Sequence, residues 1–214
     1  MSIGDLATPP LFSQAMATQA ERRASTKGKV LEAALGLFGE RGFAAVTVDD
    51  IAAAAGVAKG AVYHHFPSKE ALFEAVFERA SADLAAMIRG RRRSGDVLHA
   101  MVEGSRRYFE ACAEPPFRTI LLKDGPVVLG WERWREIDAR YFLSMLPAML
   151  EHAMADGVVP RQPTEPLARL LAGAVTEAAV ACAGADDPAA TGRAYVRALE
   201  RLVEGLRSEG PRPT

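Results

Sequence analysis

The sequence is poor in cysteine, in aromatic residues and in net charge. It has two cysteines, Cys112 and Cys182, in 214 residues, too few for a disulfide-stapled secreted scaffold, which favours a reducing compartment. The 26 Lys and Arg nearly balance the 27 Asp and Glu, which excludes a protein that coats polyanions indiscriminately. The chain has no apolar run approaching the about 20 residues that span a bilayer, and no basic segment of the kind that opens a signal peptide. We expect a cytoplasmic protein.

Signatures of catalysis are also missing. The sequence contains no Gly-rich phosphate loop, no Gly-x-Ser-x-Gly elbow and no cluster with metal-ligand spacing. His64 and His65 are adjacent, so they cannot share one face of a helix. A redox role for the cysteines has no support from a nearby basic residue or a Cys-x-x-Cys pair. We therefore expect no enzymatic activity, no cofactor and no metal.

What the sequence does have is helical periodicity. Apolar residues recur at three- and four-residue spacing and never alternate cleanly for long, which predicts an all-α fold. A first helix is expected from Ser25 to about Arg41, and another from Ser68 into the run Arg89–Arg93. The predicted parts are a flexible N-terminal arm at 1–23, a three-helix domain at 24–84, a larger helical domain at 85–208 and a tail at 209–214. In the larger domain, helices are predicted at 96–112, around 116–123, at 127–155, at 164–183 and at 188–207.

The segment VTVDDIAAAAGVAKGAVYHHFPSKEAL carries the most specific pattern. Thr47 and Asp50 form a Thr-x-x-Asp capping box at the start of a short helix that stops at Gly56. A second short helix follows, predicted from Ala58 to His64. Two short helices joined by a Gly-containing turn are typical of a helix-turn-helix, whose second helix enters the DNA major groove.

Two residues in this segment are unfavourable for helix stability and favourable for DNA. Gly60 costs about 1 kcal/mol relative to Ala inside a helix, and a close approach to DNA would explain its presence. Lys69 opposes the dipole at the start of the next helix, which Ser68 caps, but both would attract a phosphate there.

Residues 24–84, with this segment at their centre, resemble the DNA-binding domain of the TetR family of bacterial transcriptional regulators. Ala58 departs from the pattern, since many members have Ser there. The resemblance implies an all-helical homodimer with three N-terminal DNA-binding helices and a larger ligand-binding domain. By position it assigns phosphate contacts to Thr47, Tyr63, His64 and Lys69, and the groove-facing positions to Lys59, Gly60 and Ala61. Further contacts could come from Arg22, Arg23, Lys27 and Lys29.

The alternatives are structural. Tyr63 and His64 could be ordinary surface residues, and Thr47 could serve only as a cap. A helical small-molecule-binding or scaffold protein without DNA activity is the alternative function.

The C-terminal half is less specific, although LKDGPVVLGWERWREIDARYFL resembles part of the ligand domain in a subset of the family. Its aromatic residues predict an apolar pocket for a small apolar or aromatic effector, or they are simply core. The candidate pocket residues are Tyr108, Phe109, Trp131, Trp134, Tyr141, Phe142 and Met145. Candidate polar groups are His99, His152 and Glu177.

Apolar stripes on the last two predicted helices suit a four-helix dimer interface, or else burial within one protomer. The first stripe contains Leu167, Leu170, Leu171, Ala174 and Ala178, and the second contains Tyr195, Ala198, Leu199, Leu202 and Leu206. One recognition helix reads too few base pairs, so DNA binding requires a dimer. The expected function is a repressor released from double-stranded operator DNA by an effector.

Overall fold

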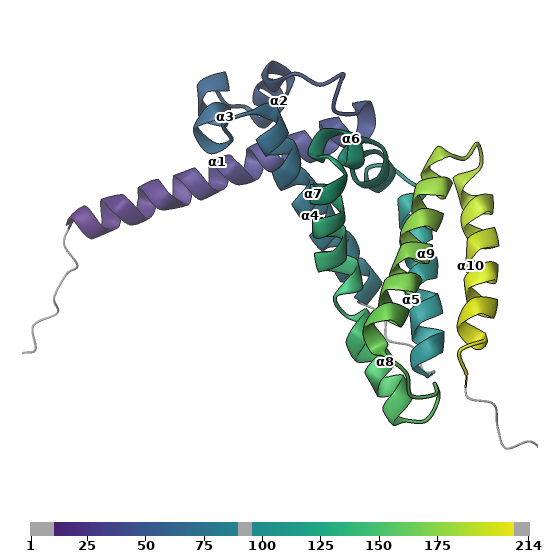
Figure 1. The fold of residues 1–214 in the computed structure, drawn as a ribbon. Helices are drawn as coiled ribbons and strands as arrows, with labels where there is room; N and C mark the ends of the chain where they lie inside the picture. Colours follow the sequence, from purple (N-terminus) through teal and green to yellow (C-terminus); the bar gives the residue numbers. More distant parts are fainter. Residues whose placement is uncertain (1–10, 90–95, 208–214) are drawn as a thin grey trace, which may run out of the picture.

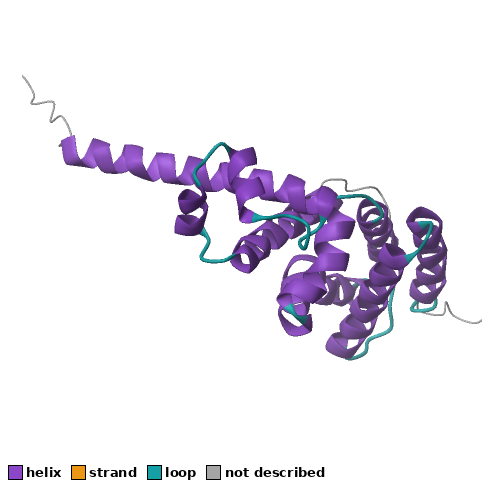
Figure 2. Cartoon of the chain, turned by 90° about the horizontal axis from the view of Figure 1, so that it is seen from above, coloured by secondary structure: helices purple, strands orange, loops and turns teal. Residues whose placement is uncertain are grey.

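A computed structural model describes residues 11–89 and 96–207, and within those ranges every regular element is helical (Figure 2). The predicted all-α fold is confirmed. The N-terminal part contains α1 (Leu11–Arg41), α2 (Val48–Ala55), α3 (Lys59–His65) and α4 (Lys69–Arg89). The remainder contains α5 (Val97–Cys112), η1 (Arg118–Asp124), α6 (Gly125–Leu129), α7 (Trp131–Asp138), η2 (Ala139–Leu143), α8 (Leu146–Ala155), α9 (Thr164–Gly184) and α10 (Pro188–Glu204).

The first helix begins earlier than expected. The predicted flexible arm covered residues 1–23, but residues 11–23 belong to α1. Residues 1–10 and the whole expected tail at 209–214 lie outside the described residues. The physical reason is local composition, because the stretch after Pro10 has no Gly or Pro and is rich in strong helix formers. The N-terminal half of α1 projects away from the rest of the fold (Figure 1).

The N-terminal unit is built on an aromatic cluster. Val30, Ala34 and Phe38 of α1 are fully buried. Phe43, just after α1, folds back so that its ring lies 5.7 Å from that of Phe38 and 5.2 Å from that of Phe73 on α4. The rings of Phe43 and Phe73 meet edge to face, and those of Phe38 and Phe43 are tilted. Such pairs pack favourably at these distances, so α1 and α4 are held together where the short helices α2 and α3 attach.

Helix α4 joins this unit to the rest of the molecule. It packs against α1 at one end and against α5, η1, α6, α7 and η2 along its length. Its stripe of buried residues extends almost from end to end: Leu72, Phe73, Val76, Phe77, Ala80 and Leu84. A movement of α4 therefore affects both parts of the chain.

The single long helix predicted at 127–155 is wrong. The structure has α6, α7, η2 and α8 there instead. Gly130 separates α6 from α7 with φ 77 and ψ 157, a conformation open essentially to glycine. Pro147 lies in the first turn of α8, where its missing N–H does no harm but where it could not continue a helix from η2. The segments η1 and η2 are π-helices, which often mark functional sites.

Helices α5, α9 and α10 pack side by side at the other end of the fold (Figure 1). By length and composition α9 could cross a membrane, but 44% of its most apolar window is buried inside the structure. A core helix of a soluble protein passes the same test. In the part of the chain that the structure describes, α9 packs against α5, α8, α10 and η1.

Gly125 is held where three elements meet, so we expect Gly125→Ala to destabilise the fold. A Cβ at this position would lie 2.6 Å from Phe77 Cε2 and 2.9 Å from Trp134 Cδ1, and both rings are fully buried. Overpacking of this kind costs about 1 to 3 kcal/mol, measurable by urea denaturation. Gly173→Ala in α9 is the control, because its Cβ would meet nothing within 4 Å. Equal stability of the two variants would contradict this packing.

Candidate nucleic-acid interface and effector cavity

The start of α2 is fixed by the predicted capping box. The Asp50 backbone N–H donates to Thr47 Oγ1 at 3.1 Å, and the Thr47 backbone N–H donates to Asp50 Oδ2 at 2.8 Å. Hydrogen bonds from Thr47, with a smaller contribution from Arg41, lower the pKa of the exposed Asp50. The cap sets the direction of α2, and Thr47 itself is exposed on the surface of the molecule.

The turn between α2 and α3 depends on Gly56. Its φ of 66 is left-handed, and its N–H satisfies carbonyls at the end of α2. Beyond the turn, Val62 and Phe66 are buried. The opposite side of α3 is exposed, and it carries Lys59, Gly60, Tyr63 and His64, with Ala61 half-buried. One face of α3 therefore anchors the helix, and the other presents the predicted groove-facing residues.

Side chains from α1 and α2 flank this exposed face. Lys59 Nζ lies 2.8 Å from Asp49 Oδ2, and this contact raises the pKa of the lysine. Arg23 Nη2 lies 2.6 Å from His64 Nε2, and because a guanidinium only donates, that ring nitrogen is the acceptor. Burial, followed by the neighbouring His64, Arg23 and Lys27, lowers the pKa of His65.

Lys69 lies at the first turn of α4, as expected. Ser68 Oγ accepts from the Ala71 backbone N–H at 3.0 Å, which confirms the predicted cap. The ammonium of Lys69 lies 4.1 Å from the centre of the Phe43 ring, a cation–π contact that holds the side chain in place. A positive charge is thus fixed beside the N-terminus of α4.

Within the described part of the chain, no packing contact requires a glycine at position 60. A Cβ built on it would meet nothing within 4 Å, so the fold has room for alanine, a better helix former. The space in front of Gly60 is open to a molecule outside this chain.

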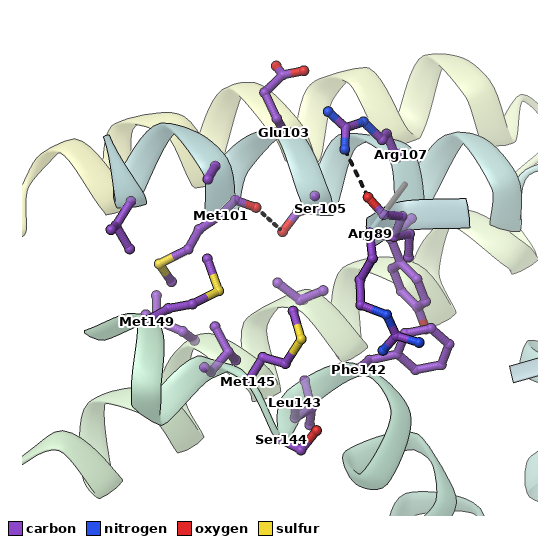
Figure 3. A pocket seen from close by; sticks show the side chains of 18 of the residues that line it. Arg89, Met101, Glu103, Ser105, Arg107, Phe142, Leu143, Ser144, Met145 and Met149 are labelled. Atoms are coloured by element: carbon purple, nitrogen blue, oxygen red, sulfur yellow. Dashed lines mark hydrogen bonds between the residues drawn. The ribbon is translucent and has the colours of Figure 1, made fainter. Parts of the chain in front are cut away.

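A cavity of about 970 Å³ lies among α4, α5, α7, η2, α8, α9 and α10. Four of the predicted pocket residues line it: Tyr108, Tyr141, Phe142 and Met145. His99 and His152 also line it, whereas Glu177 does not. Figure 3 shows the methionines Met101, Met145 and Met149 gathered on one side of the cavity, with Arg89 beside Phe142. Methionine side chains adapt to ligands of different shape.

The other three aromatic candidates lie elsewhere. Phe109 and Trp134 are buried in the core, where Trp134 Nε1 donates to the Leu121 carbonyl at 2.7 Å. Trp131 is 55% exposed and stacks with Trp134 and Arg135. Phe109 directly follows Tyr108 on α5 and therefore points to a different side of that helix. The π-helical segment η2 changes the helix face between the tryptophans on α7 and Tyr141.

Sequence reasoning missed Asp138, which also lines the cavity. It is only 6% exposed, and burial raises the pKa of its carboxyl to about 6. Thr176 Oγ1 lies 3.3 Å from Asp138 Oδ2, and Tyr108 faces the carboxyl from α5. A sequence signal did exist, because Asp138 follows the buried Trp134 by four residues and so shares its helix face.

The cavity wall is bonded directly to α4. The Tyr141 hydroxyl donates to Glu78 Oε2 at 2.6 Å, and Arg140 Nη1 donates to Glu78 Oε1 at 2.8 Å. One turn before Glu78 on α4, Glu74 Oε1 accepts a hydrogen bond from Arg133 Nε at 2.9 Å. We call these five residues the α4 ion-pair network. It joins the helix that follows the helix-turn-helix to the segment that bears the cavity.

A helix-turn-helix whose second helix has an exposed face is typical of DNA-binding transcriptional regulators. Comparisons with known proteins agree. Residues 30–76 match the family described as bacterial regulatory proteins, tetR family, and residues 98–206 match the tetracyclin repressor-like C-terminal domain. The chain belongs to the TetR family, and it is a regulator rather than an enzyme.

Individual relatives support the same assignment. A solved TetR-family regulator from Pectobacterium atrosepticum aligns with a TM-score of 0.79 and 30% identity, over 89% of this chain and 98% of that one. The HTH-type transcriptional regulator CymR of Pseudomonas putida is 39% identical over 43% of this chain. The repressor KstR2 of Mycobacterium tuberculosis is 50% identical over 23% of this chain. The chain matches 47% of the length of CymR and 25% of that of KstR2.

Gly60→Ala should separate DNA binding from stability. We expect the variant to be as stable as the wild type or more stable, by up to about 1 kcal/mol. It should bind operator DNA more weakly, because the methyl group would keep the backbone of α3 away from the groove. Thermal melts and gel shifts check the two effects. Gly36→Ala in α1 is a matched control with no atom within 4 Å of its Cβ. If Gly60→Ala binds DNA as tightly as Gly36→Ala, close approach at this position is ruled out.

Asp138→Asn should stabilise the free protein near neutral pH. The pKa of Asp138 is about 6 in the folded chain against a reference of 3.8, so between those pH values the folded state binds more protons than the unfolded state. The wild type therefore loses stability as pH rises from about 4 to about 6, by about 1 to 3 kcal/mol. The variant avoids this loss, so urea denaturation should show a gap that narrows toward about pH 4. A constant gap at every pH would contradict the assignment.

Proposed function

We propose that this chain is a cytoplasmic repressor that binds operator DNA as a homodimer and is released by a small apolar or aromatic effector in the cavity. The observation that carries the proposal is the position of α4. This helix begins at Lys69, next to α3, and its other end lines the cavity through Ala85, Ile88 and Arg89. In this proposal residues 24–84 form the DNA-binding domain and residues 85–208 form the ligand-binding and dimerisation domain.

The exposed residues of the helix-turn-helix take the DNA contacts. Thr47, Tyr63, His64 and Lys69 would bind phosphates through hydroxyl, ring N–H and ammonium groups, and such contacts fix the register of the protein on the duplex. Lys59, Gly60 and Ala61 would face the major groove. Lys59 would first leave Asp49, and because both side chains are exposed, that exchange costs little.

The α4 ion-pair network supplies the coupling between cavity and DNA. Tyr141 lines the cavity with its ring and holds Glu78 of α4 with its hydroxyl. An effector that packs against this ring and shifts η2 would move α4, and with it α3. A preference of the effector for one spacing of the two recognition helices is then sufficient to release the operator.

Helices α9 and α10 supply the dimer interface in this proposal. The two helices pack against each other, but each also has an exposed apolar side chain. Leu170 on α9 is 72% exposed and Leu202 on α10 is 50% exposed. Ala174 and Ala198 are exposed on the same two helices. Other members of the predicted stripes, Leu171, Ala178 and Leu199, are buried within the protomer. The stripes thus serve both as core and as a free apolar surface.

The operator test uses DNA from upstream of the chain's own gene. We expect sequence-specific retardation in gel shifts that weakens steeply with salt, because phosphate contacts release counterions. An effector identified by thermal-shift screening should then reduce retardation of the wild type. In Tyr141→Phe, which keeps the ring and loses the bond to Glu78, it should bind but release less DNA. Full retardation of the wild type at effector saturation would refute release by ligand.

Dimerisation is tested by charging the apolar surface. The double variant Leu170→Glu, Leu202→Glu should be monomeric in light scattering and should lose operator binding, because burying two unpaired carboxylates at an interface is strongly unfavourable. The control is Val127→Glu, which alters a residue 83% exposed on α6 and should leave the dimer intact. A dimeric double variant would place the interface on another surface.

A further inference from the structure

Three carboxyl side chains line the cavity, those of Asp96, Glu103 and Asp138, and among the described residues Asp138 is the one that is not ion-paired with an arginine. Its neighbours are neutral: the Thr176 hydroxyl at 3.3 Å and Tyr108. In the described residues, no Lys, Arg or His side chain lies within ion-pairing distance of it. By contrast, the acidic side chains Glu74, Glu78, Asp96 and Glu103, all near the cavity or α4, are each paired with an arginine.

A buried carboxylate without a cationic partner is costly, and in most proteins such a group is paired, protonated or bound to a ligand. Arg135 acts on Asp138 only at longer range, and Thr176 and Tyr108 bring no charge. The arginine of the cavity wall on α5, Arg107, donates instead to the Ile88 carbonyl at 2.9 Å. The Asp138 carboxyl therefore accepts hydrogen bonds from Thr176 and Tyr108 but has no paired cation among the described residues.

The aromatic rings around the cavity also favour a positively charged ligand group. Tyr108, Tyr141 and Phe142 all line it, and the rings of Tyr108 and Phe142 lie 5.1 Å apart. The face of an aromatic ring attracts a cation, most strongly when water is excluded. A carboxylate with aromatic rings nearby suits an ammonium group better than a neutral hydroxyl, since the site already holds two hydroxyls.

We propose that Asp138 is the specificity-determining residue of the cavity and that the effector is a cationic amine on an apolar or aromatic body. The ammonium group pairs with the Asp138 carboxylate, and the apolar body packs among the methionines Met101, Met145 and Met149. This proposal rests on the proposed function for the role of the cavity, and it adds the charge of the molecule that fills it.

The experiment compares three probes of one shape and different charge on the full-length protein: phenylbutylamine, phenylbutanol and phenylbutyrate. Titration calorimetry near neutral pH should show the amine binding at least about tenfold more tightly than the other two. In Asp138→Asn, which keeps the shape and an acceptor oxygen but loses the charge, this preference should disappear. Asp186→Asn, an exposed loop residue, is the charge-matched control and should keep it.

The pH profile is a test that needs no folded variant. The amine requires the ionised carboxyl, so its affinity for the wild type should rise from about pH 5 to about pH 7 and then level off. Tyr108 and Cys112, which face Asp138 from α5, have raised pKa values and stay neutral in this range. His99 and His152 also line the cavity but are common to wild type and Asp138→Asn, so the difference between the two profiles isolates Asp138.

The proposal is overturned if the alcohol or the acid binds as tightly as the amine, if Asp138→Asn keeps the preference, if the wild-type profile is flat, or if no amine binding is detected. Gel shifts with the same amine keep this outcome separate from the proposed function. Amine binding that depends on Asp138 but does not release DNA contradicts ligand-controlled repression and leaves the specificity assignment intact. If only a neutral or anionic molecule releases the DNA, ligand-controlled repression is supported and the assignment of Asp138 as the specificity-determining residue is contradicted.

Discussion

The burial of α4 along nearly its whole length is the constraint on which the rest of the structure depends. Phe73 packs against Phe38 and Phe43 in the N-terminal unit. Further along, Phe77 closes around Gly125 with Trp134. Close-packed interiors transmit displacement instead of absorbing it, so neither end of α4 can move alone. A recognition helix and a cavity can be coupled in this molecule because one rigid helix forms part of both cores.

The two parts use polar groups differently. In the helix-turn-helix, polar groups lie at the surface in exposed pairs such as Lys59 with Asp49. In the proposed function, these pairs exchange for contacts to phosphates. In the C-terminal part, Asp138 and Thr176 are enclosed, and their interactions are strengthened by the low dielectric of the interior. Loose contacts suit a site that must bind and leave a highly charged polymer. In the proposed function, enclosed contacts suit recognition of a single small molecule.

Local signals in the sequence predicted the N-terminal unit well. The Thr47 cap, the Gly56 turn and the Ser68 cap depend on residues close in sequence, and all three were predicted. The C-terminal part depends on contacts between distant segments. The π-helical segment η2 separates the helix face of Trp131 and Trp134 from that of Tyr141, so the two tryptophans were misplaced while Tyr141 was not. Asp138 was missed because its burial comes from α5 and α9, which lie far from it in sequence.

The α4 ion-pair network has a consequence for the cell. The side chains of this network are ion-paired but partly exposed, and those of Arg133 and Arg140 are each between a third and a half exposed. Dissolved ions therefore reach these ion pairs and screen them. Phosphate contacts to DNA weaken as ions accumulate as well. On the proposed mechanism, osmotic stress that concentrates cytoplasmic salt would loosen the grip on the operator and the link to the cavity together. The regulator would then report the ionic state of the cytoplasm along with the presence of its effector.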